Sequence, residues 1–325
     1  MTSQNKTISY SNPGEYQIDK EKLASMSYSK KIEHLKTLRI YHNSMKKIFE
    51  DIDECKNSAD YIQAPTCMCL VGPSGSGKTT FYEMYSNKYP TVKCQNGVEK
   101  PVLYCEIPCP ARIGSLAPKL LEALGDPFYG NRINITLQTQ RLYYLLKECK
   151  VKVIFLDEIQ HLVDRNSNIL IRDSSDWFKK LINETKISLI FMGMPESQKI
   201  FIENDQLLSR VRLYNLIKPF QHDDIFRTLL YMFDVNLPLK SISGLANNDM
   251  SKRILIATKG LIRNISILIR ESTILAIQSN ANKVDITMLA YVYDKYFPMY
   301  FDKNPFLTEY DIDKGFDKYT RQYIL

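Results

Sequence analysis

The stretch Cys67-Met-Cys-Leu-Val-Gly-Pro-Ser-Gly-Ser-Gly-Lys-Thr-Thr80 decides the fold, because it joins an apolar run to a glycine-rich loop. The apolar run predicts a buried strand, and the residues from about 78 to 85 predict a helix. Glycines at 72, 75 and 77 allow the backbone to curl, so that its N–H groups face phosphate oxygens. The spacing of these glycines, Lys78 and Thr79 between a strand and a helix therefore predicts a phosphate-binding loop.

Each part of this loop has a task in nucleotide binding. We expect Lys78 to reach the β- and γ-phosphates and the Thr79 hydroxyl to ligate Mg²⁺. The amino end of the following helix, which is the positive end of the helix dipole, points toward the same phosphates and favours their negative charge. We therefore predict ATP and Mg²⁺ as cofactors, bound by the loop residues Gly72, Pro73, Ser74, Gly75, Ser76, Gly77, Lys78, Thr79 and Thr80.

Two carboxylates close a second apolar strand, Val151-Lys-Val-Ile-Phe-Leu-Asp157-Glu158. Acids after a strand can also serve only as dipole partners of the next helix. Together with a phosphate-binding loop they predict a catalytic pair on a strand that neighbours the loop strand, with Asp157 at the metal and Glu158 as the base that orients the attacking water. Gln160 and His161 follow, and we expect them either to relay nucleotide state to a partner or to cap the next helix.

Strand and helix signals alternate through the first two thirds of the chain. We predict a strand over 102–107, helices over 114–124 and 137–149, and a strand over 187–192 that runs into Gly193 and Met194. Many ATPases of this kind place a polar residue near the γ-phosphate where Met194 stands, which leaves the identity of such a sensor open. Upstream, apolar residues at helical spacing predict one helix from 29 to 56, which packs on this part or lies along DNA.

Three arginines are candidates for contacts to a triphosphate. Arg210 and Arg212 follow a predicted helix, and they suit either a finger inserted into a neighbouring subunit's nucleotide or a surface ion pair. Arg263 lies near the start of a helix in a later helical region, where it could fold over the γ-phosphate or simply face solvent. That region begins at Pro219 and carries no strand signal, with helices predicted over 222–236, 251–259, 261–279 and 286–297.

These patterns predict an α/β fold with a parallel central sheet and a C-terminal α-helical lid. The predicted parts are an amino-terminal arm (1–28), an ATPase core with its amino-terminal helix (29–218), a helical lid (219–297) and an aromatic tail (298–325). The tail is too short for a core of its own. We expect its rings, among them Tyr300, Phe301, Phe306 and Tyr319, to dock on the parent domain, on a neighbouring subunit or on a partner.

Composition limits the location and the partners. The 325 residues contain no apolar run long enough to cross a bilayer, and the polar start is unlike a signal peptide, so we expect a cytoplasmic protein with no membrane partner. We expect the seven cysteines to be reduced thiols that act as small hydrophobes, not zinc ligands. The formal net charge of +7 permits binding to a polyanion without demonstrating it.

In combination, the motifs resemble the TniB/TnsC transposition regulators of Tn7-like elements, which are AAA+ ATPases similar to the IstB and MuB helper proteins. The resemblance covers residues 27–296, and its most specific stretches are Asp157-Glu-Ile-Gln-His-Leu162, Gly193-Met-Pro-Glu196 and Asn236-Leu-Pro-Leu-Lys240. It implies the AAA+ P-loop NTPase fold and a slow ATPase that DNA or a partner regulates. By the matching motifs, Lys78 and Thr79 would bind ATP and Mg²⁺, Asp157 and Glu158 would complete the catalytic centre, and Arg210, or failing that Arg212, would be the finger.

The resemblance also implies an assembly and its partners. Family members form rings or helical filaments on double-stranded DNA and link a target selector of the TniQ type to a transposase of the TnsB/TniA type. ATP hydrolysis then drives disassembly, and the protein is expected to be bacterial and DNA-associated. The family contacts DNA from loops between the second strand and the acid-bearing strand, where Arg112, Lys119 and Arg132 are candidates by region alone.

Other functions are consistent with the same fold. A helicase loader or initiator-like ATPase would differ in its client, and association with a replicative helicase would distinguish it. A signalling ATPase that oligomerises without nucleic acid would be expected to carry sensor or effector domains. A metabolic kinase is disfavoured because no signature of a small-substrate pocket is visible.

Overall fold

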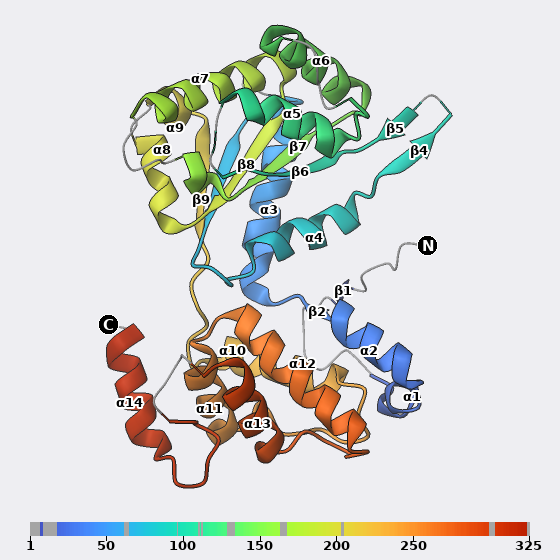
Figure 1. Ribbon diagram of the computed structural model, residues 1–325, viewed down its shortest axis with the longest axis vertical. Coiled ribbons are helices and arrows are strands. Elements are labelled where there is room, and N and C mark those ends of the chain that lie inside the picture. Colours follow the sequence, from blue (N-terminus) through green and yellow to red (C-terminus); the bar gives the residue numbers. More distant parts are fainter. Residues whose placement is uncertain are drawn as a thin grey trace. The chain divides into compact units, whose positions relative to one another are not determined.

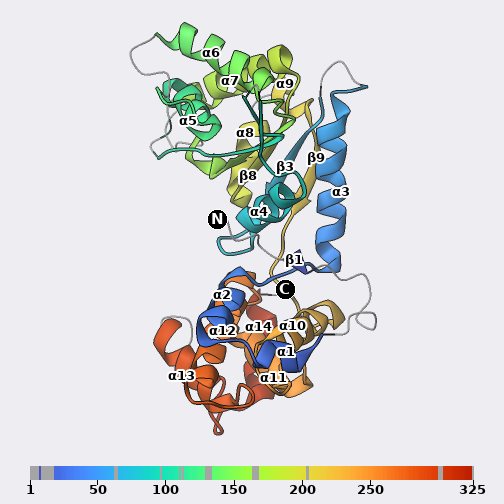
Figure 2. The ribbon, with the colours of Figure 1, turned by 90° about the vertical axis from the view of Figure 1, so that its right-hand side faces the viewer.

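The chain folds into two compact units. The computed structural model describes residues 7–8, 18–61, 65–95, 97–109, 111, 113–128, 134–162, 168–202, 205–298 and 303–323. The sheet unit comprises Lys47–Lys218, and the helical unit comprises Met1–Lys46 together with Pro219–Leu325. Figures 1 and 2 show a central sheet with helices in the sheet unit, and mainly helices in the helical unit.

A five-stranded parallel sheet in the order β6-β7-β8-β3-β9 forms the centre of the sheet unit (Figure 1). The three inner strands are buried along their whole length, as expected for parallel strands covered on both faces. The carboxyl ends of parallel strands lie on the same side of the sheet. The segments that follow β3, β7 and β8 therefore lie close together there. The strands are β3 (Cys67–Val71), β6 (Val102–Glu106), β7 (Val153–Asp157), β8 (Ser188–Gly193) and β9 (Val211–Leu216).

Helices cover both faces of this sheet. On one face, α5 (Ile113–Leu124), α6 (Ile135–Glu148) and α7 (Asn168–Thr185) pack in a single apolar cluster with the strands. On the other, rings of α3 (Asn43–Ser58) and α4 (Lys78–Lys88) pack together, and Tyr85 of α4 lies 5.8 Å from Phe155 of β7. The smaller elements are β4 (Val92–Cys94), β5 (Gly97–Glu99), η1 (Ile159–Leu162), η2 (Pro195–Gln198), α8 (Lys199–Ile202) and α9 (Asp205–Leu208).

The topology corrects one detail of the sequence-based prediction. The acid-bearing strand β7 does not neighbour the loop strand β3, because β8 lies between them. Two further features were not predicted, the edge strand β9 and the exposed antiparallel hairpin of β4 and β5. In β9, exposed residues alternate with partly buried or buried ones, so the strand carries no continuous apolar run.

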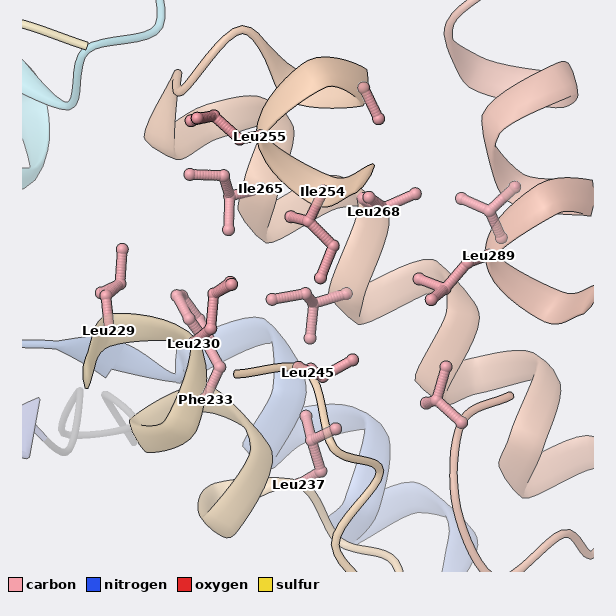
Figure 3. Packing of buried hydrophobic residues seen from close by; sticks show 14 of the residues in the cluster. Leu229, Leu230, Phe233, Leu237, Leu245, Ile254, Leu255, Ile265, Leu268 and Leu289 are labelled. Carbon is pink, nitrogen blue, oxygen red and sulfur yellow. The ribbon is translucent and has the colours of Figure 1, made fainter. Parts of the chain in front are cut away.

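The helical unit is built around an apolar core from α10 (Asp224–Asn236), α11 (Asn248–Thr258), α12 (Ile262–Gln278) and α13 (Ile286–Tyr296). Figure 3 shows Leu230 and Phe233 facing the same interior as Ile254, Leu268 and Leu289. Among the described residues, no helix of either unit is long and apolar enough to cross a membrane.

The amino-terminal segment packs on this unit, which differs from the prediction of one helix over 29–56. The structure has α1 (Lys20–Ala24), α2 (Tyr28–Thr37) and a short strand β2 (Arg39–Ile40), which pairs with β1 (Thr7–Ile8), before α3 begins. Leu35, Leu38 and Ile40 are buried in the helical-unit core. Lys20 Nζ donates hydrogen bonds to the Asp234 and Leu237 carbonyls at 2.9 and 2.8 Å, which satisfies acceptors at the end of α10.

The aromatic tail packs on the same unit. Phe306, and Tyr319 of α14 (Ile312–Tyr323), are buried in its core. Asn304 Nδ2 donates to the Ala290 carbonyl at 2.9 Å, and the Arg253 guanidinium donates to the carbonyls of Pro305 and Leu307. The sequence allowed docking on the parent domain, on a neighbouring subunit or on a partner, and these two rings pack on the chain's own helical unit. Tyr300 and Phe301 lie outside the described residues.

Candidate nucleotide site

The loop between β3 and α4 has the backbone that its glycines predict. Gly75 and Gly77 have φ values of 81° and 92°, in the left-handed region that glycine adopts without strain. At Gly72 the limit is space, because an added Cβ would lie 2.6 Å from Ser76 Oγ and 2.9 Å from the Ile217 carbonyl oxygen. The loop therefore curls tightly on itself and against Ile217, the residue after β9.

Polar atoms inside the loop fit an anion. Lys78 is only 9% exposed, and its Nζ donates to the carbonyls of Gly72 at 2.8 Å and Pro73 at 3.2 Å. Ser76 Oγ is buried and has no hydrogen-bond partner among the described residues. A buried ammonium group and an unsatisfied hydroxyl both favour a partner that accepts hydrogen bonds. A triphosphate supplies such oxygens.

Asp157 connects the loop to the strand β7 across the intervening β8. Its Oδ2 accepts hydrogen bonds from Thr79 Oγ1 at 2.9 Å and from the Tyr104 hydroxyl at 3.0 Å. Its Oδ1 accepts from the Glu158 backbone N–H at 2.9 Å, and the residue is 2% exposed. A hydroxyl and a carboxylate held together are ligands that suit Mg²⁺. The two predicted metal residues are thus adjacent.

Tyr104 is a member of this site that the sequence analysis did not find. Its ring stacks on Tyr82 of α4 at 4.6 Å, which aims the hydroxyl at Asp157. Burial and then the charge of Asp157 raise the pKa of Tyr104, so it stays a hydrogen-bond donor. The residue belongs to β6, a strand predicted only for its apolar character, and no local motif marks its role.

Glu158 occupies an unusual backbone conformation. Its φ of 59° lies in the left-handed region, which costs a residue with a side chain about 1 kcal/mol. The turn separates the end of β7 from η1 and leaves the Glu158 side chain half-buried. Gln160 Nε2 donates a hydrogen bond to Glu158 Oε2, and His161 Nδ1 lies 2.9 Å from the Ile107 carbonyl oxygen.

The two arginines near β9 lie far from the chain's own loop. Arg210 precedes the amino end of β9, where its carbonyl accepts from Cys67 N–H at 2.9 Å, whereas the loop follows the carboxyl end of β3. At about 3.3 Å per residue, the length of β3 separates the amino ends of the strands from their carboxyl ends by about 16 Å. Arg210 Nε is buried without a partner among the described residues, and Arg212 is exposed. Arg210 lines a cavity of about 510 Å³ with Asp176, Lys179, Lys180, Asn183, Glu184 and Ser209.

The remaining predicted residues are not brought to the loop within the sheet unit. Arg263 is exposed near the amino end of α12, in the helical unit. Lys119 is exposed on α5, and its Nζ pairs with Glu122 Oε2 at 2.7 Å. Arg112 and Arg132 lie outside the described residues.

Comparison with known proteins agrees with this geometry. The family model described as the bacterial TniB protein matches residues 31–220. The chain belongs to the TniB family. No curated protein matches this TniB-family chain.

Several solved structures are similar to this TniB-family chain. The Cdc6p protein of Pyrobaculum aerophilum is 13% identical with a TM-score of 0.57, over 85% of this chain and 70% of that one. The ORC1 protein of Aeropyrum pernix, solved in complex with DNA, is 14% identical with a TM-score of 0.52, over 78% and 65%. A Walker-type ATPase of Pyrococcus abyssi is 13% identical with a TM-score of 0.53, over 77% and 72%. These likenesses show the fold, that of an AAA+ P-loop ATPase.

Proposed function

We propose that this TniB-family chain is an ATP-dependent, DNA-binding transposition regulator. It oligomerises as a ring or filament on double-stranded DNA and links a target selector of the TniQ type to a transposase of the TnsB/TniA type, and slow, partner-regulated hydrolysis drives disassembly. It acts in the bacterial cytoplasm. The observation that carries the proposal is the family match over a sheet unit that holds Lys78, Thr79, Asp157 and Glu158 at one sheet edge.

In this proposal each residue of the edge has one task. Lys78 and the loop N–H groups bind the phosphates, and Thr79 and Asp157 hold Mg²⁺, which when bound neutralises charge on the phosphate oxygens. Glu158 accepts a proton from the attacking water and orients it. Arg263, in the helical unit, is the remaining proposed nucleotide-binding residue.

The finger belongs to a second copy of the chain. Arg210 lies at the amino ends of the parallel strands, whereas the loop of its own subunit lies at their carboxyl ends. A contact between Arg210 and a nucleotide therefore requires the site of a neighbouring subunit. Its buried, unpaired Nε supports this role over that of a surface ion pair. Arg212, exposed on β9, is the alternative finger.

DNA is contacted through its phosphates. The ORC1 relative was solved with DNA, and the net charge of +7 is compatible with such a partner. Arg112, Lys119 and Arg132 remain the proposed contacts. Binding through phosphates is weakly sequence-specific and steeply salt-dependent.

Electron microscopy of the protein with double-stranded DNA tests this function. We expect rings or filaments on DNA with ATP or a non-hydrolysable analogue, none with ADP, and fewer at the higher of two salt concentrations. Lys78→Ala is the control, because it should lose nucleotide binding and assembly together. Nucleotide-dependent oligomers that ignore DNA would contradict the proposal and favour a signalling ATPase.

A second candidate is a helicase loader or initiator-like ATPase, because the similar solved structures include Cdc6p and an ORC1 protein in complex with DNA. Pull-down with a purified transposase and with a purified replicative helicase separates the two. Selective retention of the helicase would favour this second function.

A further inference from the structure

The side chain of Gln160 joins the proposed base to the end of a different strand. Its Nε2 donates a hydrogen bond to Glu158 Oε2, and its Oε1 accepts one from the Met194 backbone N–H at 3.1 Å. Glu158 follows β7, whereas Met194 follows β8, the strand between β7 and the loop strand β3. Both polar ends of the Gln160 amide are therefore used, each by a different strand end.

Space for this side chain depends on a glycine. A Cβ added to Gly193, the last residue of β8, would lie 2.5 Å from Ser197 Oγ, 2.7 Å from Ile159 Cγ1 and 2.8 Å from Gln160 Oε1. Real Cβ atoms do not approach neighbours this closely, so a side chain at 193 would displace Gln160 or η1. Gly193 and Met194 carry no polar side chain, and the polar side-chain atoms nearest to an added Gly193 Cβ are Ser197 Oγ and Gln160 Oε1.

The contacts distinguish Gln160 from a residue that merely caps a helix. Gln160 lies inside η1, not before it, and neither of its amide atoms bonds to a free N–H of the η1 turn. The Gln160 amide N–H instead bonds the Glu158 carboxylate, at the residue whose φ of 59° turns the chain out of β7.

We infer that Gln160 is a positioning residue for ATP hydrolysis: it holds the Glu158 carboxylate through its amide N–H and fixes that carboxylate relative to the end of β8 through the Met194 N–H. This inference rests on the proposed ATPase function. Many ATPases of this kind have a polar side chain near the γ-phosphate at the position of Met194. In this chain we assign that role to Gln160.

Steady-state kinetics of two near-isosteric variants test the inference. Gln160→Met removes both hydrogen bonds, and Gln160→Glu keeps the acceptor for Met194 N–H but cannot donate to Glu158. We expect both to lower kcat by about 10- to 100-fold, as loss of a supporting hydrogen bond around a metal site does, with KM for ATP and nucleotide affinity within about threefold of wild type. Gln278→Met, at an exposed position at the end of α12, is the matched control and should change neither constant.

Each other outcome has a definite meaning. A folded Gln160→Met protein with wild-type kcat, a raised kcat, or a raised KM at unchanged kcat would overturn the inference. Failure of both variants to fold, judged by thermal melting, would make Gln160 a structural residue and overturn it as well. If the wild-type protein itself does not hydrolyse ATP, the proposed function fails first. If Glu158→Gln loses ATP hydrolysis while both Gln160 variants keep the wild-type kcat, this inference is wrong and the proposed function is unaffected.

Discussion

Glu158 and Asp157 are adjacent acids with different surroundings. Asp157 is buried and accepts three hydrogen bonds, whereas Glu158 is half-buried and bonds Gln160. We expect Glu158→Gln to keep ATP binding, to lower kcat by about 10²- to 10⁴-fold because the base is lost, and to lock the oligomer on DNA. Nucleotide affinity and phosphate release measure this, with Lys78→Ala as the variant that should not bind nucleotide. Rapid hydrolysis by Glu158→Gln would refute the role of this acid.

Tyr104 makes a separate prediction about the metal residues. Tyr104→Phe keeps the stacking on Tyr82 but removes a hydrogen bond from buried Asp157. We expect half-maximal ATPase activity to require about tenfold more Mg²⁺, because a supporting partner of a metal ligand is lost. A Mg²⁺ titration measures this. Tyr143→Phe is the matched control, since the Tyr143 hydroxyl has no hydrogen-bond partner among the described residues. An equal effect of both changes would contradict the role of Tyr104.

Elements that carry their own signal could be predicted, and those defined by distant partners could not. The strand β3, helix α4 and strand β7 follow from local apolar runs and the loop glycines. The edge strand β9 alternates exposed and partly buried residues, and its place depends on pairing with β3 from the other end of the unit. Gln160 likewise meets Met194, a contact 34 residues away that no local pattern marks. Non-local pairing explains both omissions.

The segment between β2 and α3 gives a pH prediction. Burial lowers the pKa of His42 from 6.5 to about 4, where its ring lies 5.1 Å from Phe220 and 2.5 Å from Ser44 Oγ. Between pH 6.5 and 4 the unfolded chain binds a proton that the folded chain does not, so this group's contribution to stability falls as the pH falls. From pH 7 to 5 the loss is about 2 kcal/mol. His42→Gln should lack this loss, so urea unfolding at both pH values should show a smaller pH effect. Equal effects in both proteins would contradict it.

At the scale of the whole molecule, the two arginines and the loop define a direction. The loop follows the carboxyl end of β3, and Arg210 precedes the amino end of β9. One chain therefore presents a nucleotide site at the carboxyl ends of the parallel strands and a candidate finger at their amino ends. An interface that joins unlike surfaces is heterologous, and it generates rings or helical filaments. The sequence alone placed Arg210 after a predicted helix and gave no sign of β9, so it could not show on which side of the sheet Arg210 lies, because that depends on the pairing of β9 with β3.

Mixing two inactive variants tests this direction. Arg210→Ala keeps loop and base but lacks the finger, and Glu158→Gln keeps the finger but lacks the base. If the finger acts on a neighbour's nucleotide, about a quarter of the interfaces in an equimolar mixture join an intact base to an intact finger, so ATPase activity should return to about that fraction of wild type. Arg212→Ala in place of Arg210→Ala identifies which arginine is needed, because only the finger variant is inactive alone. No recovery, although both variants enter one oligomer, would show that Arg210 acts within its own chain or only supports the fold.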